Sequence, residues 1–243
     1  MKYMGSKSRF AKAIYAKICE ISPRNGRAWV EPFAGGMNMI CEVPSEDGPR
    51  YANDCNEYLI ELFKAAVLGF EFPEFVTSEE RKFIKQNPEK FAPWQVGYAG
   101  FICGFGGDFN GGFAGKSNTK IGTVRNYQDE GARSLKKQAS KLTDVFFCNA
   151  SYDEILIPEN SIVYCDPPYD GVTGYGIEFN HCEFWNWTRN ISKEHEVFIS
   201  EYNAPEDFEC VWQSVAKSSL SANGKSGGSK QSVEKLFRIA KNV

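Results

Sequence analysis

Four consecutive residues, Asp166, Pro167, Pro168 and Tyr169, form the pattern with the clearest chemical use. Asp166 ends the apolar segment 161–166, which predicts a buried strand. The four residues therefore lie at the carboxyl end of a strand, where open α/β sheets bind ligands. The two prolines fix the turn and remove two backbone donors, which leaves the Asp166 carboxylate and the Pro167 carbonyl as acceptors. An amino group with two N–H bonds fits these acceptors, and Tyr169 offers a flat face on which a ring can stack.

A glycine turn near the start of the chain is the second pattern. Phe33, Ala34, Gly35 and Gly36 follow a short predicted strand over residues 27–31. Glycines allow a backbone to approach a ligand closely, although a plain tight turn explains this pattern equally well. The third glycine of the dinucleotide fingerprint is absent, which argues against an oxidoreductase. Asp54 ends a predicted strand and can accept hydrogen bonds from ribose hydroxyls, or can be a solvated strand-end acid.

Hydrophobic periodicity predicts the elements that position these two patterns. The order of strand, turn, helix, strand, acid and helix is that of a doubly wound nucleotide-binding sheet, so we expect an α/β fold. Helices are predicted over residues 8–21, 56–68 and 179–191, and one can open at 37–41. Strands are predicted over residues 27–31, 51–54, 144–149, 161–166 and 196–200, with 233–239 as a final edge strand after a polar loop at 221–232.

Residues 70–145 interrupt the α/β pattern and predict an inserted, mainly helical subdomain. Helical patterns cover residues 78–86, 93–100 and 127–142. Seven of the nineteen residues from 104 to 122 are glycine, so no regular core element is expected there. We therefore divide the chain into a catalytic domain, residues 1–69 and 146–243, and an insert of residues 70–145.

Composition indicates a soluble globular protein in the cytoplasm. Of the 243 residues, 42% are hydrophobic and 24% charged, and no apolar run approaches the roughly 20 residues that span a membrane. The start of the chain lacks a secretory signal. The eight cysteines form no C-x-x-C pair and the two histidines have no ligand-like neighbours, so we expect reduced, mostly buried thiols and no metal centre. No exposed apolar stripe is obvious, and we expect a monomer.

Positive charge is segregated along the chain. Its net charge is −3, yet residues 1–27, 116–141 and 217–243 carry +6, +5 and +5. Such segregation is typical of a protein with one basic face for nucleic acid, although ordinary solvated faces explain it equally well. Within the glycine-rich segment and just after it, Lys116, Lys120 and Arg125 are expected to meet nucleic-acid phosphates.

The order of these motifs resembles the DNA adenine methylase family over almost the whole chain. That order runs from Lys2-Tyr3-Met4-Gly5-Ser6-Lys7 through Phe33-Ala34-Gly35-Gly36 and an insert to Asp166-Pro167-Pro168-Tyr169. The resemblance implies a Rossmann-like S-adenosylmethionine-dependent methyltransferase sheet with a target-recognition insert. It implies transfer of a methyl group from S-adenosylmethionine to the N6 amine of an adenine flipped out of double-stranded DNA.

The resemblance also assigns residues to the cofactor. It implies that Tyr3, Lys7 and the turn from Phe33 to Gly36 touch it, and that Asp54 holds its ribose. Ser151 and Tyr152 fall in the stretch beside the cofactor adenine, and Asp166 lies near both cofactor and target amine.

Two alternatives stay open. An adenine methyltransferase of ribosomal RNA can use a similar tetrapeptide, although the long insert favours duplex DNA. A catalytically silent DNA-binding protein is the other, and the intact tetrapeptide argues against it. A cytosine methylase more often has Ser where Asp166 stands.

Overall fold

The computed structural model describes residues 1–118, 122–169, 179–217 and 231–240. Within these ranges, no helix is long and apolar enough to cross a membrane, and no group of three or more His, Cys, Asp or Glu side chains is arranged to hold a metal ion. All eight cysteines are free. Four of them are exposed, so the expectation of mostly buried thiols was wrong.

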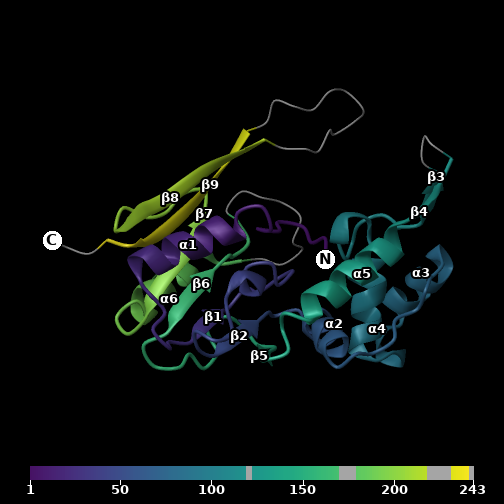
Figure 1. The fold of residues 1–243 in the computed structure, drawn as a ribbon, viewed down its shortest axis with the longest axis horizontal. Coiled ribbons are helices and arrows are strands. Elements are labelled where there is room, and N and C mark those ends of the chain that lie inside the picture. Colours follow the sequence, from purple (N-terminus) through teal and green to yellow (C-terminus); the bar gives the residue numbers. More distant parts are fainter. Residues whose placement is uncertain (119–121, 170–178, 218–230, 241–243) are drawn as a thin grey trace.

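A seven-stranded sheet forms the centre of the molecule (Figure 1). Its strands lie in the order β5-β2-β1-β6-β7-β9-β8. The first five are parallel, whereas β9 runs antiparallel to both β7 and β8. The strands are β1 (Trp29–Glu31), β2 (Arg50–Asn53), β5 (Val145–Cys148), β6 (Ile162–Cys165), β7 (Glu196–Glu201), β8 (Phe208–Lys217) and β9 (Gln231–Ile239).

This architecture confirms the expected α/β fold with a mostly parallel sheet. The chain builds outward from β1 to β2 and β5, and later from β6 to β7 on the other side, so the strand order reverses between β1 and β6. Ligands of open α/β sheets bind at such a reversal, beyond the carboxyl ends of the strands. The glycine turn follows β1 and the proline turn follows β6, so the fold brings the two patterns together.

Three helices form where the hydrophobic periodicity predicted them outside the insert. They are α1 (Ala11–Ile21), α2 (Glu57–Val67) and α6 (His181–Ile191). The Asn56 side chain caps α2 by accepting from Leu59 N at 3.1 Å, and Asn180 caps α6 in the same way. The helix expected at 37–41 was wrong, because only one 3₁₀ turn, η1 (Ile40–Glu42), forms there. Met37 adopts a left-handed φ of 55° and interrupts regular helix.

The C-terminal hairpin differs from the expectation in two ways. Strand β8 was not predicted at all, and its register shifts between Cys210 and Trp212, which breaks the alternation that marks a strand. Strand β9 was predicted, but as an edge strand. It lies instead between β7 and β8. Most of the polar loop expected at 221–232 falls outside the described residues.

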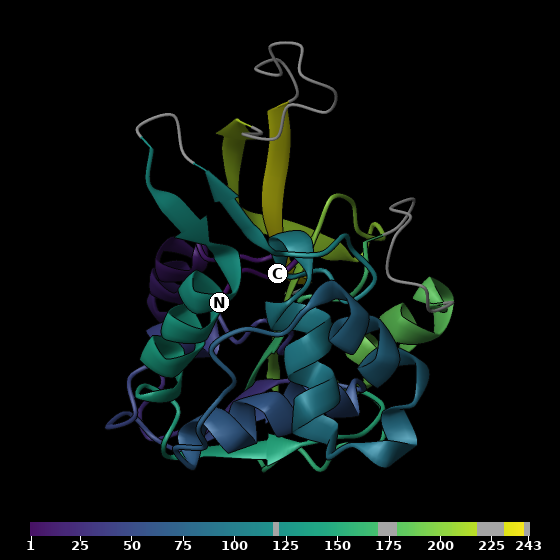
Figure 2. The same ribbon diagram turned by 90° about the vertical axis from the view of Figure 1, so that its right-hand side faces the viewer.

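The insert is mainly helical and packs beside the β5 end of the sheet (Figure 1). Its helices lie near the predicted positions. A small hairpin of β3 and β4 begins in the glycine-rich region and ends just after it. The elements are α3 (Ser78–Gln86), η2 (Pro88–Lys90), α4 (Pro93–Gly97), the π-helical η3 (Tyr98–Ile102), η4 (Phe105–Gly107), β3 (Lys116–Asn118), β4 (Val124–Asn126) and α5 (Tyr127–Ala139). Figure 2 shows that the β3–β4 hairpin and the β8–β9 hairpin rise on the same side of the molecule.

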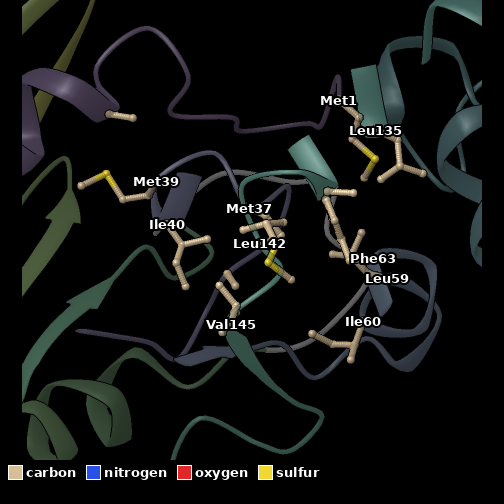
Figure 3. Close-up of a cluster of buried hydrophobic side chains, with 14 of the residues drawn as sticks. Met1, Met37, Met39, Ile40, Leu59, Ile60, Phe63, Leu135, Leu142 and Val145 are labelled. Carbon is tan, nitrogen blue, oxygen red and sulfur yellow. The ribbon is translucent and has the colours of Figure 1, made fainter. Parts of the chain in front are cut away.

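One hydrophobic core joins the insert to the sheet. Leu135 of α5, Phe63 of α2 and Met37 after the glycine turn are each fully buried in the same cluster. Figure 3 shows these side chains gathered with Leu142 and Val145, where the chain leaves the insert and enters β5. Burying a side chain of this size contributes about 1.5–3 kcal/mol, so insert and sheet stabilise one another.

Candidate functional site

The glycine turn after β1 is packed against the ring of Tyr3. A Cβ atom on Gly36 would lie 2.6 Å from Tyr3 Cβ, and one on Gly35 would lie 2.9 Å from Tyr3 Cε1. Gly35 also has a φ of 47°, a conformation that side chains disfavour. Both positions therefore require glycine, and the ring of Tyr3 lies directly on the turn.

Asp54 fixes the glycine turn from the neighbouring strand. Its Oδ2 accepts from Gly35 N at 2.9 Å and its Oδ1 accepts from Asn56 N at 3.0 Å. Burial raises the pKa of Asp54, and these two backbone donors oppose that shift. Each carboxylate oxygen keeps a second lone pair with which it can accept a ligand hydroxyl.

Asp166 directly follows β6 and is paired with a lysine from the start of the chain. Lys7 Nζ lies 2.8 Å from Asp166 Oδ1, and the Lys7 side chain is 9% exposed. The same ammonium group lies 4.5 Å from the centre of the Tyr169 ring, within cation–π range. Lys7 thus joins the first and last residues of the proline turn.

Burial dominates the electrostatics of this region. It raises the pKa of Asp166, and the nearby Lys7 ammonium lowers that pKa in part. Glu31, at the end of β1, is 1% exposed and accepts from Trp29 Nε1 at 2.8 Å. Desolvation raises the pKa of Glu31 to about 8. The site therefore combines an acid that is protonated at neutral pH with an ion pair.

A cavity of about 360 Å³ connects the two turns. Its walls include Tyr3, Lys7, Phe33, Ala34, Gly35, Gly36, Asp54, Asp166, Pro167 and Pro168, all of them expected from the sequence. Sites for small ligands are commonly of this size. Tyr169 does not line the cavity, and its ring packs at 4.7 Å against Tyr202 beside it.

Asn38 gives the cavity an unsatisfied donor. Its Nδ2 atom is buried and has no hydrogen-bond partner among the residues that the structure describes, and Asn38 lines the cavity wall just after the glycine turn. A buried donor in this condition costs free energy that a ligand acceptor removes. With the carboxylate of Asp54, the walls offer groups for both a carboxylate and a sugar. They therefore fit S-adenosylmethionine, which carries both.

Two expected cofactor residues lie elsewhere. Ser151 donates to the Asp153 carboxylate, and Tyr152 stacks on Phe33 with ring centres 5.2 Å apart. Among the described residues, neither of the two lines the cavity. Tyr152 supports the cavity wall from behind through Phe33. A direct contact with the cofactor remains a prediction for both.

Of the three expected DNA contacts, two are described. Lys116 and Arg125 are exposed on the β3–β4 hairpin. Lys116 Nζ lies 4.8 Å from the Phe75 ring, and Arg125 pairs with Glu130 at 2.6 Å. Lys120 falls outside the described residues. Part of the positive charge of residues 1–27 lies inside the protein and not on a basic surface, because Lys7 and Arg24 are buried.

Several site residues had not been expected from the sequence. Phe101, Asp108, Phe109 and Asn110 line the cavity from the insert. The glycine content of their segment favoured a surface loop, yet Phe109 packs on Phe101 at 5.2 Å. Glu234, on β9, was also missed, and it accepts from the Tyr169 hydroxyl at 2.5 Å. The sequence feature that could have indicated Glu234 is its position two residues before Leu236, on the same face of the predicted strand.

Comparisons with known proteins agree with this geometry. The model of a family described as D12 class N6 adenine-specific DNA methyltransferase matches residues 3–110 and 108–203. The type II methyltransferase M.CviBI of Paramecium bursaria Chlorella virus NC1A is 26% identical over 74% of this chain and 70% of its own. The retron Ec67 DNA adenine methylase of Escherichia coli is 29% identical over 72% of this chain and 65% of its own.

Solved structures resemble the chain only distantly. The rRNA methyltransferase aviRa from Streptomyces viridochromogenes has a TM-score of 0.47 and 11% identity, over 98% of this chain and 86% of its own. A likeness at this level carries no argument about substrate.

Proposed function

Since the chain belongs to the D12 class N6 adenine-specific DNA methyltransferase family, we propose that its cavity holds S-adenosylmethionine and presents to it an adenine of double-stranded DNA. The chain is an enzyme that methylates the N6 amine of adenine in DNA, and S-adenosylmethionine is its methyl donor. One observation carries the proposal: the glycine turn, Asp54 and the Asp166–Pro167 turn line a single cavity.

The residues of the glycine turn and of β2 form the cofactor half. Asp54 receives ribose hydroxyls on its remaining lone pairs, and Asn38 donates from Nδ2 to the carboxylate of the amino-acid part. Tyr3 and Lys7 close the cavity from the N-terminal segment. The positive sulfonium supplies an activated methyl group, so the protein contributes position and electric field.

The proline turn forms the amine half. The adenine amine is a poor nucleophile because its lone pair is delocalised into the ring. Hydrogen bonds from its two N–H groups to the Asp166 carboxylate and the Pro167 carbonyl favour a pyramidal nitrogen and stabilise the positive charge that develops there. The lone pair then points at the methyl carbon.

Base flipping follows from the position of the turn. An amine inside a duplex cannot reach a cavity lined by backbone and buried side chains, so the adenine leaves the helix. The ring of Tyr169 stacks on the flipped base, supported by its contact with Tyr202.

The two hairpins are proposed to hold the duplex. Both rise on one side of the molecule (Figure 2), and β3–β4 presents Lys116 and Arg125. Together with Lys120 they neutralise phosphates near the target adenine. The insert, residues 70–145, reads the sequence around it.

We further propose that the enzyme acts in the cytoplasm as a monomer. Eight free thiols suit a reducing compartment.

Transfer of radiolabel from S-adenosylmethionine tests the function. Duplex DNA lacking N6-methyladenine, matched single strands and ribosomal RNA are each incubated with the enzyme and digested to nucleosides. Label in N6-methyladenine from duplex DNA is expected. Label in RNA alone contradicts the duplex substrate, and absence of label from all three contradicts the enzyme.

A further inference from the structure

Glu234 brings a second carboxylate to the proline turn. It lies on β9, beyond the residues that the family model matches. Its Oε1 accepts from the Tyr169 hydroxyl at 2.5 Å and lies 3.7 Å from Lys7 Nζ. The side chain is 11% exposed.

The sheet holds Glu234 in this position. In the β7–β9 pairing, Ser200 lies opposite Leu236, and alternation along β9 places Glu234 on the same face as the buried Leu236. Burying a carboxylate at such a position costs several kcal/mol unless partners compensate. Tyr169 and Lys7 are those partners, and both belong to the reaction site.

Lys7 therefore serves two carboxylates at once. Its ammonium lies 2.8 Å from Asp166 and 3.7 Å from Glu234. When all three groups are ionised, they carry two negative charges and one positive charge. Desolvation raises the pKa of Asp166 and the pKa of Glu234, so each carboxylate accepts a proton more readily than it would in water.

Three titratable groups beside the cluster, Tyr164, Tyr169 and Glu31, are neutral near pH 7. Tyr164, on β6, has a pKa well above its ordinary value because it is fully buried, and its hydroxyl lies 2.8 Å from Ser200 Oγ. Burial also raises the pKa of Tyr169. Glu31, on β1, is protonated below its pKa of about 8. Within the cluster, the charge is therefore carried by Lys7, Asp166 and Glu234.

Methylation of the amine releases one proton that this cluster can take. A bond forms between the amine nitrogen and the methyl carbon, the carbon–sulfur bond breaks with its electron pair left on sulfur, and the nitrogen gives up one proton. An N–H bonded to Asp166 delivers that proton to its carboxylate. With Glu234 ionised, the cluster changes from one negative charge to neutral. Without that charge it would change from neutral to positive in a desolvated site, which is unfavourable.

We propose that Glu234 is a positioning residue for this reaction, which anchors the Tyr169 hydroxyl and the Lys7 ammonium and supplies the negative charge that lets Asp166 accept the proton released by the amine. This inference rests on the proposed function.

The test compares Glu234→Gln, which keeps the shape and removes the charge, with Glu234→Asp, which keeps the charge. Glu209→Gln is the matched control. Glu209 lies on the same hairpin, and its Oε1 atom is 2.7 Å from Arg238 Nε, so it pairs with Arg238 and not with the cluster. Steady-state methylation of duplex DNA is measured from pH 5 to 9. Melting temperature and calorimetric binding of S-adenosylhomocysteine report the fold.

Glu234→Gln is expected to lower kcat about 10- to 100-fold and to leave the KM for S-adenosylmethionine unchanged. Its acid limb should move to lower pH, because Asp166 holds a proton less tightly once the neighbouring negative charge is gone. Glu234→Asp should recover part of the rate and the wild-type acid limb. Glu209→Gln should match the wild type.

A Glu234→Gln variant with wild-type rate and acid limb overturns the inference. A Glu234→Asp variant that loses as much rate as Glu234→Gln also overturns the inference. A Glu234→Asp variant that does not fold overturns it as well, because either result indicates a carboxylate with a structural role only. A wild type that makes no N6-methyladenine overturns the proposed function as well, whereas an active wild type confines the failure to Glu234.

Discussion

The two turns that line the cavity follow neighbouring strands, yet they are held in different ways. The glycine turn after β1 is fixed by van der Waals contact with Tyr3 and by hydrogen bonds to Asp54, both from the first 54 residues. The proline turn after β6 is held by charged groups from the two ends of the chain, Lys7 and Glu234. One turn depends on shape and the other on charge.

This difference separates binding from chemistry. A turn built by close packing fails when a side chain is added, and the ligand that needs its backbone is then lost. A turn built by ion pairs in a desolvated place keeps its shape when one charge is removed, but its electric field changes. Substitutions in the two turns should therefore alter different kinetic constants.

The largest effect is expected at the proline turn. Asp166→Ala removes the acceptor of the amine and of its proton, so kcat should fall by at least about 10²–10³-fold. Lys7 and Glu234 remain paired in this variant, and the fold should persist. Calorimetry with S-adenosylhomocysteine should give nearly wild-type affinity. An active Asp166→Ala enzyme would refute the assignment.

The corresponding change in the glycine turn should affect binding first. Gly36→Ala forces a methyl group to within 2.6 Å of Tyr3 Cβ and 2.8 Å of Asn38 Nδ2. Overpacking of this kind costs about 1–3 kcal/mol, and a loss of that size in binding corresponds to roughly 5- to 150-fold weaker cofactor affinity. Gly112→Ala is the control, because a Cβ there meets nothing within 4 Å. Equal cofactor affinities in the two variants would contradict the packing role.

Charge reversal on the β3–β4 hairpin should leave both turns intact. Lys116→Glu with Lys120→Glu removes two proposed phosphate contacts, so the slope of log K against log salt should flatten by about 2. Fluorescence anisotropy at several salt concentrations measures it, and Lys193→Glu at the end of α6 provides the control. The rate at saturating DNA should change little. An unchanged slope would remove this hairpin from the interface.

The smallest effect concerns Glu31, which precedes the glycine turn. Its pKa in the folded protein is about 8, against 4.5 for a glutamate side chain exposed to water. Because the folded pKa is the higher one, its contribution to stability is complete below pH 4.5 and is lost as pH rises to 8. The free energy of unfolding should decrease with pH between 4.5 and 8 in the wild type. In Glu31→Gln this decrease should be smaller by up to about 1.4 kcal/mol per pH unit. Urea unfolding at pH 5.5 and 7.5 provides the comparison, and parallel slopes would show that Glu31 is ionised in the fold.

Local contacts explain which parts of the site were predictable. Strand, glycine turn and Asp54 are close in sequence, and their residue types reflect backbone requirements that any such turn imposes. Most of the sheet was predicted for the same reason, since buried parallel strands are apolar runs. Ser151 and Tyr152 were assigned by resemblance alone, and Tyr152 packs behind Phe33 instead of lining the cavity.

Long-range contacts explain what was missed. Glu234 lies 65 residues after Tyr169, and only the antiparallel insertion of β9 between β7 and β8 brings the two together. Strand β8 escaped prediction because its shift at Cys210 and Trp212 disrupts alternation. Phe109 was hidden by the glycines around it, although it packs into the cavity wall.

The core shared by Leu135, Phe63 and Met37 bears on how new sequence specificities can arise in this scaffold. If the insert reads DNA sequence as proposed, an insert exchanged between relatives would have to carry side chains that complement α2 and the segment after the glycine turn. Grafting residues 70–145 as an independent cassette would leave those apolar surfaces mismatched. Diversification should instead proceed by changes in the β3–β4 hairpin, whose described strand residues, 116–118 and 124–126, lie outside that core.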